Sequence, residues 1–269
     1  MLGVRAGFHS VRAAAATLRR TPRRSPIEGS TMATLGIIGS GHIGSAVARL
    51  AVAADMNVII ANSRGPETLQ DLVTELGPLA QAGTVIDVAD GADAVVLSIP
   101  LKAVADLPEG LLADTLVIDT SNYYPSRDGS IPELADNTVT TSELVRNQLG
   151  ATRYVKAFNN IVSAHITALA RPAGAADRTA LPIAGDDAQA KSEAAAIINR
   201  LGFDTVDAGT LHESWRFEPE TPAYGKIYFS DPALPEDQMM DAEPAPTPAS
   251  EVREALDAAT RVDIAARRF

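Results

Sequence analysis

The sequence predicts an α/β fold, a doubly wound parallel sheet with helices on both faces. From Thr34 to Gly209, short runs rich in valine and isoleucine alternate with longer stretches of helical periodicity. Several of the short runs are apolar at every position, which is typical of strands buried on both faces, as in a parallel sheet. Regular alternation of strand and helix favours the doubly wound arrangement.

The elements can be assigned in chain order. The runs expected to form strands lie at 35–38, 57–61, 84–88, 94–100, 115–120, 154–158, 181–185 and 204–209. A helix is expected over 45–54, where apolar residues recur at helical spacing. Another begins near Pro66, because proline is favoured in the first turn of a helix. A third covers 186–202 and ends at a glycine, which is typical of helix C-termini.

The chain changes character after Trp215. Residues 217–249 are rich in proline and acidic side chains, and proline removes backbone donors that regular structure needs, so we expect an irregular segment. A final helix is expected over 250–269, with Ser250 as its N-cap and basic residues at its end. The expected organisation is a domain over 32–216 followed by a small C-terminal extension.

Residues 1–31 differ in charge from the rest of the chain. They carry six arginines and one acid, Glu28, whereas the whole chain has a formal net charge of −11. An arginine-rich, acid-poor start is typical of a transit peptide. A disordered tail, or an over-extended start before Met32, is the alternative that we favour. In each case we expect this leader segment to lie outside the fold.

Composition excludes several classes of function. Hydrophobic residues make up 46% of the chain and charged residues 21%, as in ordinary globular proteins. The acidic balance argues against a nucleic-acid binder. There are no cysteines, which excludes disulfides, thiolate catalysis and cysteine metal sites. Because no apolar run approaches the roughly 20 residues that cross a bilayer, we expect a soluble, cytoplasmic protein with no membrane partner.

A glycine-rich hexapeptide lies between the first predicted strand and the first predicted helix, and consists of Gly39, Ser40, Gly41, His42, Ile43 and Gly44. In this context the G-x-G-x-x-G pattern predicts a Rossmann-like dinucleotide-binding domain. The first glycine permits a tight turn, the second lets the backbone approach a pyrophosphate, and the third allows close helix packing. The helix N-terminus then offers N–H groups to the phosphates. A merely structural glycine turn is the alternative.

The second predicted strand lacks the acidic residue that would bind the ribose hydroxyls of NAD. Asn62, Ser63 and Arg64 follow it instead. A hydroxyl and a guanidinium suit a dianionic 2′-phosphate, which a carboxylate would repel. The sequence therefore predicts NADP(H) as the cofactor, with Ser63 and Arg64 as the residues that distinguish it. The alternative is that Arg64 is an ordinary surface residue.

Polar residues and a proline follow two further predicted strands. Ser98, Ile99 and Pro100 end one strand, and Asn122 follows the next. Ligands of doubly wound sheets collect at this edge, so we expect these residues beside the nicotinamide ring and its ribose. Ordinary turn and capping chemistry is the alternative for both segments.

Taken together, these segments resemble a known family. IGSGHIGSAVA, ANSRGPETL, VVLSIP, VIDTSNYYPSRDG, KAFNNI, LPIAGDD and LGFDTVDAGTLHESW are similar to the NADP oxidoreductases that depend on the 8-hydroxy-5-deazaflavin coenzyme. The resemblance covers 34–216. KAFNNI also resembles the NADPH-binding domain of the six-transmembrane metalloreductases. The resemblance implies hydride exchange between NADPH and a deazaflavin co-substrate, with no metal and no covalent intermediate.

The resemblance also adds residues to the expected site. Ala157, Phe158 and Asn159 match the strand end that faces the nicotinamide ring on its other side. The proline-rich tail is longer than in the family, and it would reshape or cover the acceptor pocket. Two alternatives stay open: an NADPH-dependent reductase of an imine, quinone, flavin or ferric chelate, and a non-catalytic NADP-binding module. A homodimer through the terminal helix is also open, with a small molecule as the redox partner.

No catalytic acid–base residue is assigned. Hydride transfer needs little beyond the positioning of two rings, and the cofactors carry the chemistry. A hydroxyacid dehydrogenase of related fold would place a lysine on the helix after the sixth strand, where this chain reads SAHITALA. Lys156 precedes that helix and is the one lysine nearby that could take such an acid–base role. His165 is expected on a helix surface, and His212 in a polar turn.

Aromatic residues cluster after the predicted domain. We expect them to anchor the tail by burying apolar area, and stacking on a planar acceptor is the alternative; they are Trp215, Phe217, Tyr224, Tyr228 and Phe229. Tyr123 and Tyr124 pose the same choice nearer the cofactor, and there neither is favoured.

Overall fold

The computed structural model describes residues 33–267, except for the side chains of residues 236, 237, 240 and 265. The expectation for residues 1–31 lies outside the described residues, as does the predicted end of the terminal helix at 268–269. Within the described range, no helix is both long enough and apolar enough to cross a membrane.

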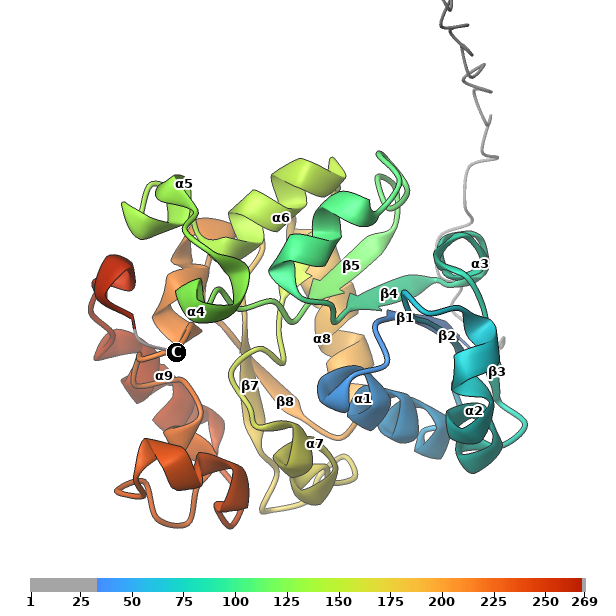
Figure 1. Cartoon of the computed structure of the whole chain (residues 1–269). Coiled ribbons are helices and arrows are strands. Elements are labelled where there is room, and N and C mark those ends of the chain that lie inside the picture. The colour runs from blue at the N-terminus through green and yellow to red at the C-terminus, as the bar shows by residue number, and fades with distance from the viewer. Residues whose placement is uncertain (1–32, 268–269) are drawn as a thin grey trace, which may run out of the picture. The chain divides into compact units, whose positions relative to one another are not determined.

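A parallel sheet forms the centre of the described fold (Figure 1). Its six strands follow the order β3-β2-β1-β4-β5-β6, and every neighbouring pair is parallel. The order reverses between β1 and β4, and the ligand crevice of such a sheet lies at the carboxyl ends of these two strands. The predicted Rossmann-like, doubly wound sheet is confirmed. Its strands are β1 (Thr34–Ile38), β2 (Asn57–Ala61), β3 (Ala80–Ala82), β4 (Ala94–Leu97), β5 (Leu116–Asp119) and β6 (Tyr154–Lys156).

The last two predicted strands form a separate small sheet. β7 (Ala180–Ile183) and β8 (Asp204–Asp207) pair in parallel with each other. A single antiparallel bridge between Lys156 and Ala184 joins this pair to the end of β6. Strand periodicity carries no information about pairing partners, so the sequence pattern does not distinguish this arrangement from one continuous sheet.

Helices cover both faces of the main sheet and bury two hydrophobic clusters (Figure 1). Alternate residues of a strand point to opposite faces, so that Ile37 of β1 lies in the first cluster and Ile38 in the second. One face carries α1 (His42–Ala53), α7 (Ser163–Leu169) and α8 (Ala188–Arg200), and the other carries α3 (Val85–Gly91) and α6 (Thr141–Leu149). The other α-helices of the described residues are α2 (Gln70–Leu76), α4 (Pro125–Asp128), α5 (Pro132–Ala135) and α9 (Ala249–Asp257).

The segment 84–88, expected as a strand, forms the start of helix α3, so that prediction is wrong. Thr84 is the N-cap: its hydroxyl accepts a hydrogen bond from the Asp87 N–H at 3.2 Å, and the Asp87 carboxylate accepts one from the Thr84 N–H at 2.8 Å. Hydrogen bonds that the Asp87 carboxylate accepts from the Thr84 N–H and from the Thr84 hydroxyl hold the pKa of Asp87 below its usual value. A reciprocal capping box of this kind starts a helix, and it outweighs the β-branched composition of the segment.

Thr84→Ala is expected to lower the free energy of unfolding by about 1 kcal/mol, the usual loss for an N-cap threonine. Urea unfolding followed by circular dichroism measures this loss. Thr74→Ala is the matched control, because the Thr74 hydroxyl donates to the Gln70 carbonyl within α2 and caps no helix. Equal losses in the two variants would contradict the cap.

The terminal helix is shorter than predicted, because α9 ends at Asp257. The chain beyond it packs on the domain. Ile264 is buried in the second hydrophobic cluster, and the Arg267 guanidinium donates to the Tyr123 carbonyl at 2.8 Å and the Pro219 carbonyl at 3.1 Å. These tertiary contacts override the helical pattern. The homodimer contact expected for this helix stays a prediction.

The segment between Phe217 and α9 contains the short 3-10 helices Lys226–Tyr228 and Glu236–Asp241. Its buried aromatic side chains hold it on the domain. Phe217, Tyr228 and Phe229 are buried, and the Tyr228 hydroxyl accepts from Asn160 Nδ2 at 2.9 Å and donates to the Ala180 carbonyl at 3.2 Å. The anchoring role is confirmed for these three residues. Trp215 is only half-buried, and the Arg261 guanidinium lies 4.6 Å from its ring centroid.

Candidate functional site

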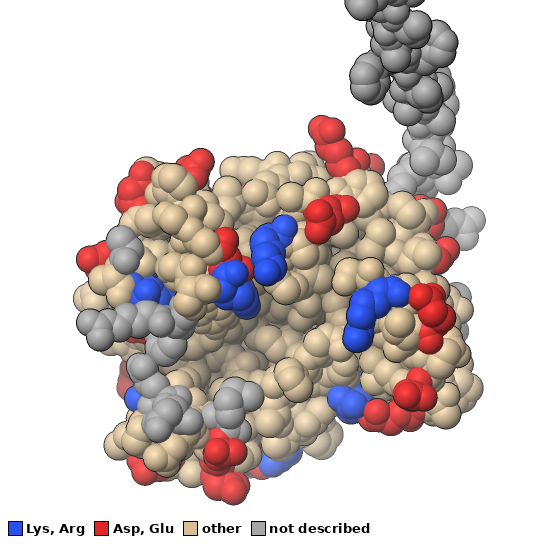
Figure 2. Space-filling model, viewed as in Figure 1, with Lys and Arg blue, Asp and Glu red and all other residues tan. Residues whose placement is uncertain are grey.

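A cavity of about 990 Å³ lies at the carboxyl ends of β1, β4 and β5. This volume is at the upper end of the range for ligand sites. Figure 2 shows it as a hollow whose floor is largely free of charged side chains, with lysine or arginine side chains at its rim. Its walls are residues 41–43 at the start of α1, 98–100 after β4, 120–122 after β5, 159–163 after β6, and 219–222 and 224–226 of the C-terminal extension.

The three glycines of the hexapeptide have different surroundings. A Cβ atom at Gly39, whose φ is +110°, would lie 2.0 Å from the Ser98 carbonyl oxygen, and one at Gly44 would lie 1.9 Å from the Gly39 carbonyl oxygen. The fold itself therefore requires both of these glycines. A Cβ atom at Gly41 would meet nothing within 4 Å. Gly41 instead leaves open space at the start of α1, which has no side-chain cap, and a pyrophosphate fits this cradle.

Asn62 organises the loop after β2. Its Oδ1 atom accepts from the Arg64 N–H at 2.9 Å, and its Nδ2 donates to Ser40 Oγ at 3.2 Å and to Thr68 Oγ1 at 2.9 Å. The amide therefore joins this loop to the glycine-rich loop. This positioning role was missed in the sequence, where the residue stood out only as the replacement for an acid.

Ser63 and Arg64 are exposed beside Asn62, outside the lining of the cavity. Among the described residues, the Arg64 guanidinium has no ion-pair partner. The exposed position leaves both side chains accessible to a phosphate. Their role as readers of the 2′-phosphate stays a prediction.

The predicted site residues come together in part. Eight of the predicted site residues line the cavity, namely Gly41, His42, Ile43, Ser98, Ile99, Pro100, Asn122 and Asn159. Asn122 and Asn159 bind each other: Asn122 Nδ2 donates to the Asn159 carbonyl at 2.7 Å, and Asn159 Nδ2 donates to Asn122 Oδ1 at 3.1 Å. Each amide keeps hydrogen-bonding capacity beyond this pair.

Ala157 and Phe158, which were expected to face the nicotinamide ring, do not line the cavity. Both are fully buried, and the Phe158 ring meets Phe203 edge-on at a centroid distance of 5.9 Å. Phe158 also has a left-handed backbone, with φ of +60°. The turn at Phe158 directs its ring to the core and brings the next residue, Asn159, to the cavity wall.

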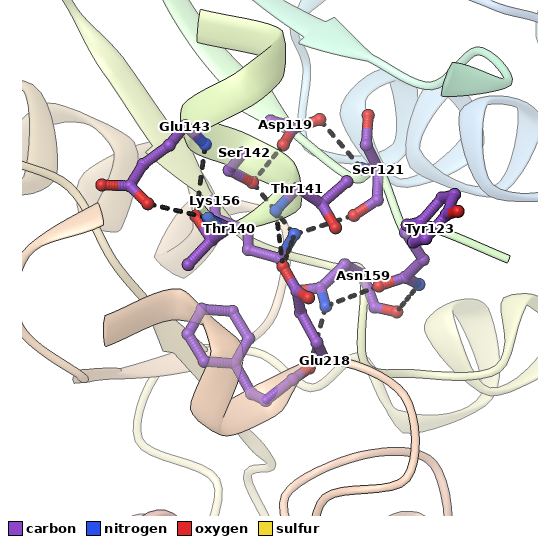
Figure 3. Close-up of polar contacts among 12 residues, drawn as sticks. Asp119, Ser121, Tyr123, Thr140, Thr141, Ser142, Glu143, Lys156, Asn159 and Glu218 are labelled. Carbon is purple, nitrogen blue, oxygen red and sulfur yellow. Dashed lines mark hydrogen bonds and ion pairs between the residues drawn. The ribbon is translucent and has the colours of Figure 1, made fainter. Parts of the chain in front are cut away.

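A buried polar network lies behind the cavity wall (Figure 3). Lys156 is fully buried, and its Nζ donates to the Ser121 carbonyl at 2.8 Å and to Ser142 Oγ at 2.9 Å, with Glu218 Oε1 at 3.3 Å. Lys156 does not line the cavity. The polar ends of two apolar strands, Asp119 and Lys156, were visible in the sequence, but their link to Glu218 was not.

The C-terminal extension forms the far wall of the cavity. The hydroxyl groups of Tyr124 and Tyr224 share a hydrogen bond of 2.6 Å, and the Arg127 guanidinium lies 4.8 Å from the Tyr124 ring centroid. Burial, and then the neighbouring Tyr124, raise the pKa of Tyr224 above its usual value. Tyr123 serves the structure: its hydroxyl donates to the Gly129 carbonyl at 2.8 Å.

The histidines differ from expectation at one position. His165, expected on a helix surface, is buried, so that prediction is wrong. Its Nε2 lies 2.6 Å from the Ala242 carbonyl oxygen, because the extension covers this side of α7, which the helical pattern does not predict. His212 is exposed, with its Nδ1 3.2 Å from the Glu143 carboxylate. His42 is exposed at the mouth of the cavity.

Comparisons with known proteins agree with this geometry. The family model described as NADP oxidoreductase, coenzyme F420-dependent, matches residues 34–123. The hypothetical protein SMa0349 of Sinorhizobium meliloti, a solved structure, is 32% identical; the superposition covers 72% of this chain and 93% of that protein, with a TM-score of 0.61.

Two further proteins are similar. The putative F420-dependent NADP-reductase of Arthrobacter sp. FB24 is 24% identical over 67% of this chain and 86% of its own, with a TM-score of 0.54, and it shares the fold. The Escherichia coli (strain K12) protein YjhV is 42% identical over 53 residues, which are 20% of this chain; the match spans only 39% of the length of that relative. With the family match extending from β1 to the turn after β5, a 32% identical relative covered almost completely, and the Arthrobacter protein of the same fold, the chain belongs to the family described as NADP oxidoreductase, coenzyme F420-dependent.

Proposed function

We propose that this protein transfers a hydride between NADPH and an 8-hydroxy-5-deazaflavin, the chemical class of coenzyme F420. The observation that carries the proposal is the continuity of one cavity from the open cradle at Gly41 to the wall around Tyr224. Such a cavity has room for a nicotinamide ring and for a second ring beside it. When bound, NADPH supplies the hydride from its nicotinamide ring.

The residues present fit the parts of NADPH. The backbone N–H groups at Gly41 and His42 would hold the pyrophosphate. Ser63 and Arg64 would hold the 2′-phosphate, and no carboxylate stands at the end of β2 to repel it. The segment 98–100 would lie against one side of the nicotinamide ring, with Asn122 and Asn159 beside its ribose or carboxamide.

The acceptor would lie between the nicotinamide ring and the C-terminal extension. Tyr124 and Tyr224 offer flat surfaces there, and Ile161, Val162 and Met239 offer apolar ones. Hydride transfer requires the donor and acceptor carbons to meet at roughly 3 to 3.5 Å, so the contribution of the protein is to orient two rings and exclude water.

The test mixes purified protein with NADPH and oxidised 8-hydroxy-5-deazaflavin and follows the absorbance band of the deazaflavin. Bleaching of that band with equimolar oxidation of NADPH is the expected result. Oxidation of NADPH only with an imine, quinone, flavin or ferric chelate would assign a different acceptor. Binding of NADPH without turnover on any of these acceptors would favour a non-catalytic module.

Asn62→Asp is expected to weaken NADPH binding about tenfold, the effect of about 1.4 kcal/mol of repulsion between the new carboxylate and the 2′-phosphate. Binding of NADH should strengthen, because a carboxylate there accepts hydrogen bonds from the ribose hydroxyls. Fluorescence titration with each nucleotide measures both effects. Asn199→Asp, exposed on α8, adds the same charge and is the control. An unchanged ratio of the two affinities in Asn62→Asp would contradict the assignment of this loop.

A further inference from the structure

Lys156 stands in an unusual place for a lysine. It ends β6, in register with Asp119 at the end of β5, and both side chains are fully buried. Burial of charged groups is unfavourable unless hydrogen bonds and opposite charges compensate it. Neither residue lines the cavity, so contact with a ligand does not explain them.

The contacts of Lys156 clamp one residue of the cavity wall. Its Nζ donates to the Ser121 carbonyl at 2.8 Å. The Ser121 N–H in turn donates to Asp119 Oδ1 at 2.8 Å. Ser142 Oγ completes the ring of contacts, since it accepts from Lys156 Nζ at 2.9 Å and donates to Asp119 Oδ2. Both backbone polar groups of Ser121 are thus held by buried charges (Figure 3).

The same ammonium group reaches the opposite wall. Glu218 Oε1 lies 3.3 Å from Lys156 Nζ and also accepts from the Thr141 N–H at 3.2 Å. Glu218 directly precedes residues 219–222, which line the acceptor side of the cavity. Asn159 adds a second link, because its Nδ2 donates to the Phe217 carbonyl at 2.9 Å. One buried cation therefore joins the cofactor side and the acceptor side.

We propose that Lys156 is a positioning residue that sets the spacing between the nicotinamide ring and the acceptor, acting through Ser121 on one wall and Glu218 on the other. The inference rests on the proposed function for its kinetic consequence. Lys156 Nζ donates two hydrogen bonds within the network, forms an ion pair with Glu218 and does not line the cavity, so Lys156 orients the walls instead of exchanging a proton with substrate.

The test compares Lys156→Met with the double variant Lys156→Met/Glu218→Gln. The single variant leaves Asp119 and Glu218 buried without a cation, so it is expected to be less stable. The double variant leaves one buried carboxylate, Asp119, which still accepts from the Ser121 N–H and from Ser142 Oγ. Its melting temperature should therefore approach that of the wild type, although the link between the two walls is absent.

The kinetic readout separates positioning from stability. In the double variant, kcat with NADPH and 8-hydroxy-5-deazaflavin is expected to fall about 10- to 100-fold, the scale of an ångström-sized misplacement of reacting groups. The Kd for NADPH should stay within about threefold, because the lost contacts do not touch the phosphates. Lys191→Met is the matched control: Lys191 pairs with Asp207 at 2.7 Å outside the cavity, and kcat should not change.

If the double variant were stable and its kcat equalled that of the wild type, the proposal would be overturned, because Lys156 would then only neutralise charge. The fluorescence of NADPH bound to the protein, measured with no acceptor present, gives a readout that does not depend on the proposed function. A shorter fluorescence lifetime of the bound nicotinamide in the double variant than in the wild type supports positioning. An equal fluorescence lifetime in the two proteins overturns it. If the lysine variants do not fold, the same fluorescence lifetime is measured in Ser142→Ala. This variant keeps every charge, so the expected decrease in lifetime is smaller. Absence of deazaflavin reduction by the wild type would refute the proposed function alone.

Discussion

Arg64→Ala is expected to weaken NADPH binding by about 1.5 to 3 kcal/mol, the scale of hydrogen bonds to a charged group. This corresponds to an increase in Kd of about one to two orders of magnitude. Arg64 follows β2 in an exposed loop, where Asn62 accepts from its backbone N–H and joins the loop to the glycine-rich loop, so its side chain is accessible to a bound phosphate. Binding of NADH, which lacks the 2′-phosphate, should change little.

Isothermal titration calorimetry with both nucleotides measures this effect. Arg49→Ala is the matched control, because Arg49 is also exposed but forms an ion pair with Glu75 at 2.6 Å. The control should bind NADPH as the wild type does. Unchanged NADPH affinity in Arg64→Ala, or equal or tighter binding of NADH by the wild type, would refute the cofactor assignment.

Gly41→Ala and Gly44→Ala are expected to have opposite effects. Gly44→Ala should destabilise the fold by about 1 to 3 kcal/mol or more, because its Cβ atom would lie 1.9 Å from the Gly39 carbonyl oxygen and force α1 away from the sheet. Gly41→Ala should leave the free energy of unfolding unchanged or raise it slightly, because φ at Gly41 is −71° and a Cβ atom there meets no protein atom.

For NADPH binding, Gly41→Ala is the variant that is expected to lose affinity. The added methyl group of Gly41→Ala occupies the cradle, and NADPH binding should weaken by about 1.5 to 3 kcal/mol through lost hydrogen bonds to the pyrophosphate. Urea unfolding and NADPH fluorescence titration on both variants measure the two effects. If Gly41→Ala bound NADPH as tightly as the wild type, the pyrophosphate would not lie at this glycine.

Much of the fold could be predicted because its signals are local. The strand 57–61 has the predicted bounds, and the glycine-rich loop lies between β1 and α1 as its spacing requires. The errors have equally local causes. A capping box starts helix α3 within 84–88, where a strand was predicted. The strand that pairs with β2 is the short segment Ala80–Ala82, which has no apolar run from which it could be predicted.

The site could be predicted only on its nucleotide side. The glycine-rich loop, residues 98–100 and Asn122 are recognisable from a pattern within a few residues. The acceptor wall is not, because Tyr224 meets Tyr124, and Glu218 meets Lys156, across long stretches of sequence. Burial of His165 under Ala242 has the same origin. Contacts between distant segments depend on tertiary packing, which neither periodicity nor spacing encodes.

The far wall of the cavity comes from a stretch that follows the nucleotide-binding sheet in the chain. In the proposed function, the residues that would bind the dinucleotide phosphates precede β3, whereas part of the wall that would contact the redox partner lies in residues 218–267. Recombination or drift in the later part would alter the partner while leaving the earlier part intact. Exchange of residues 218–267 between homologues should accordingly shift partner selectivity, to which Tyr124, Ile161 and Val162 also contribute, and leave the dinucleotide preference unchanged.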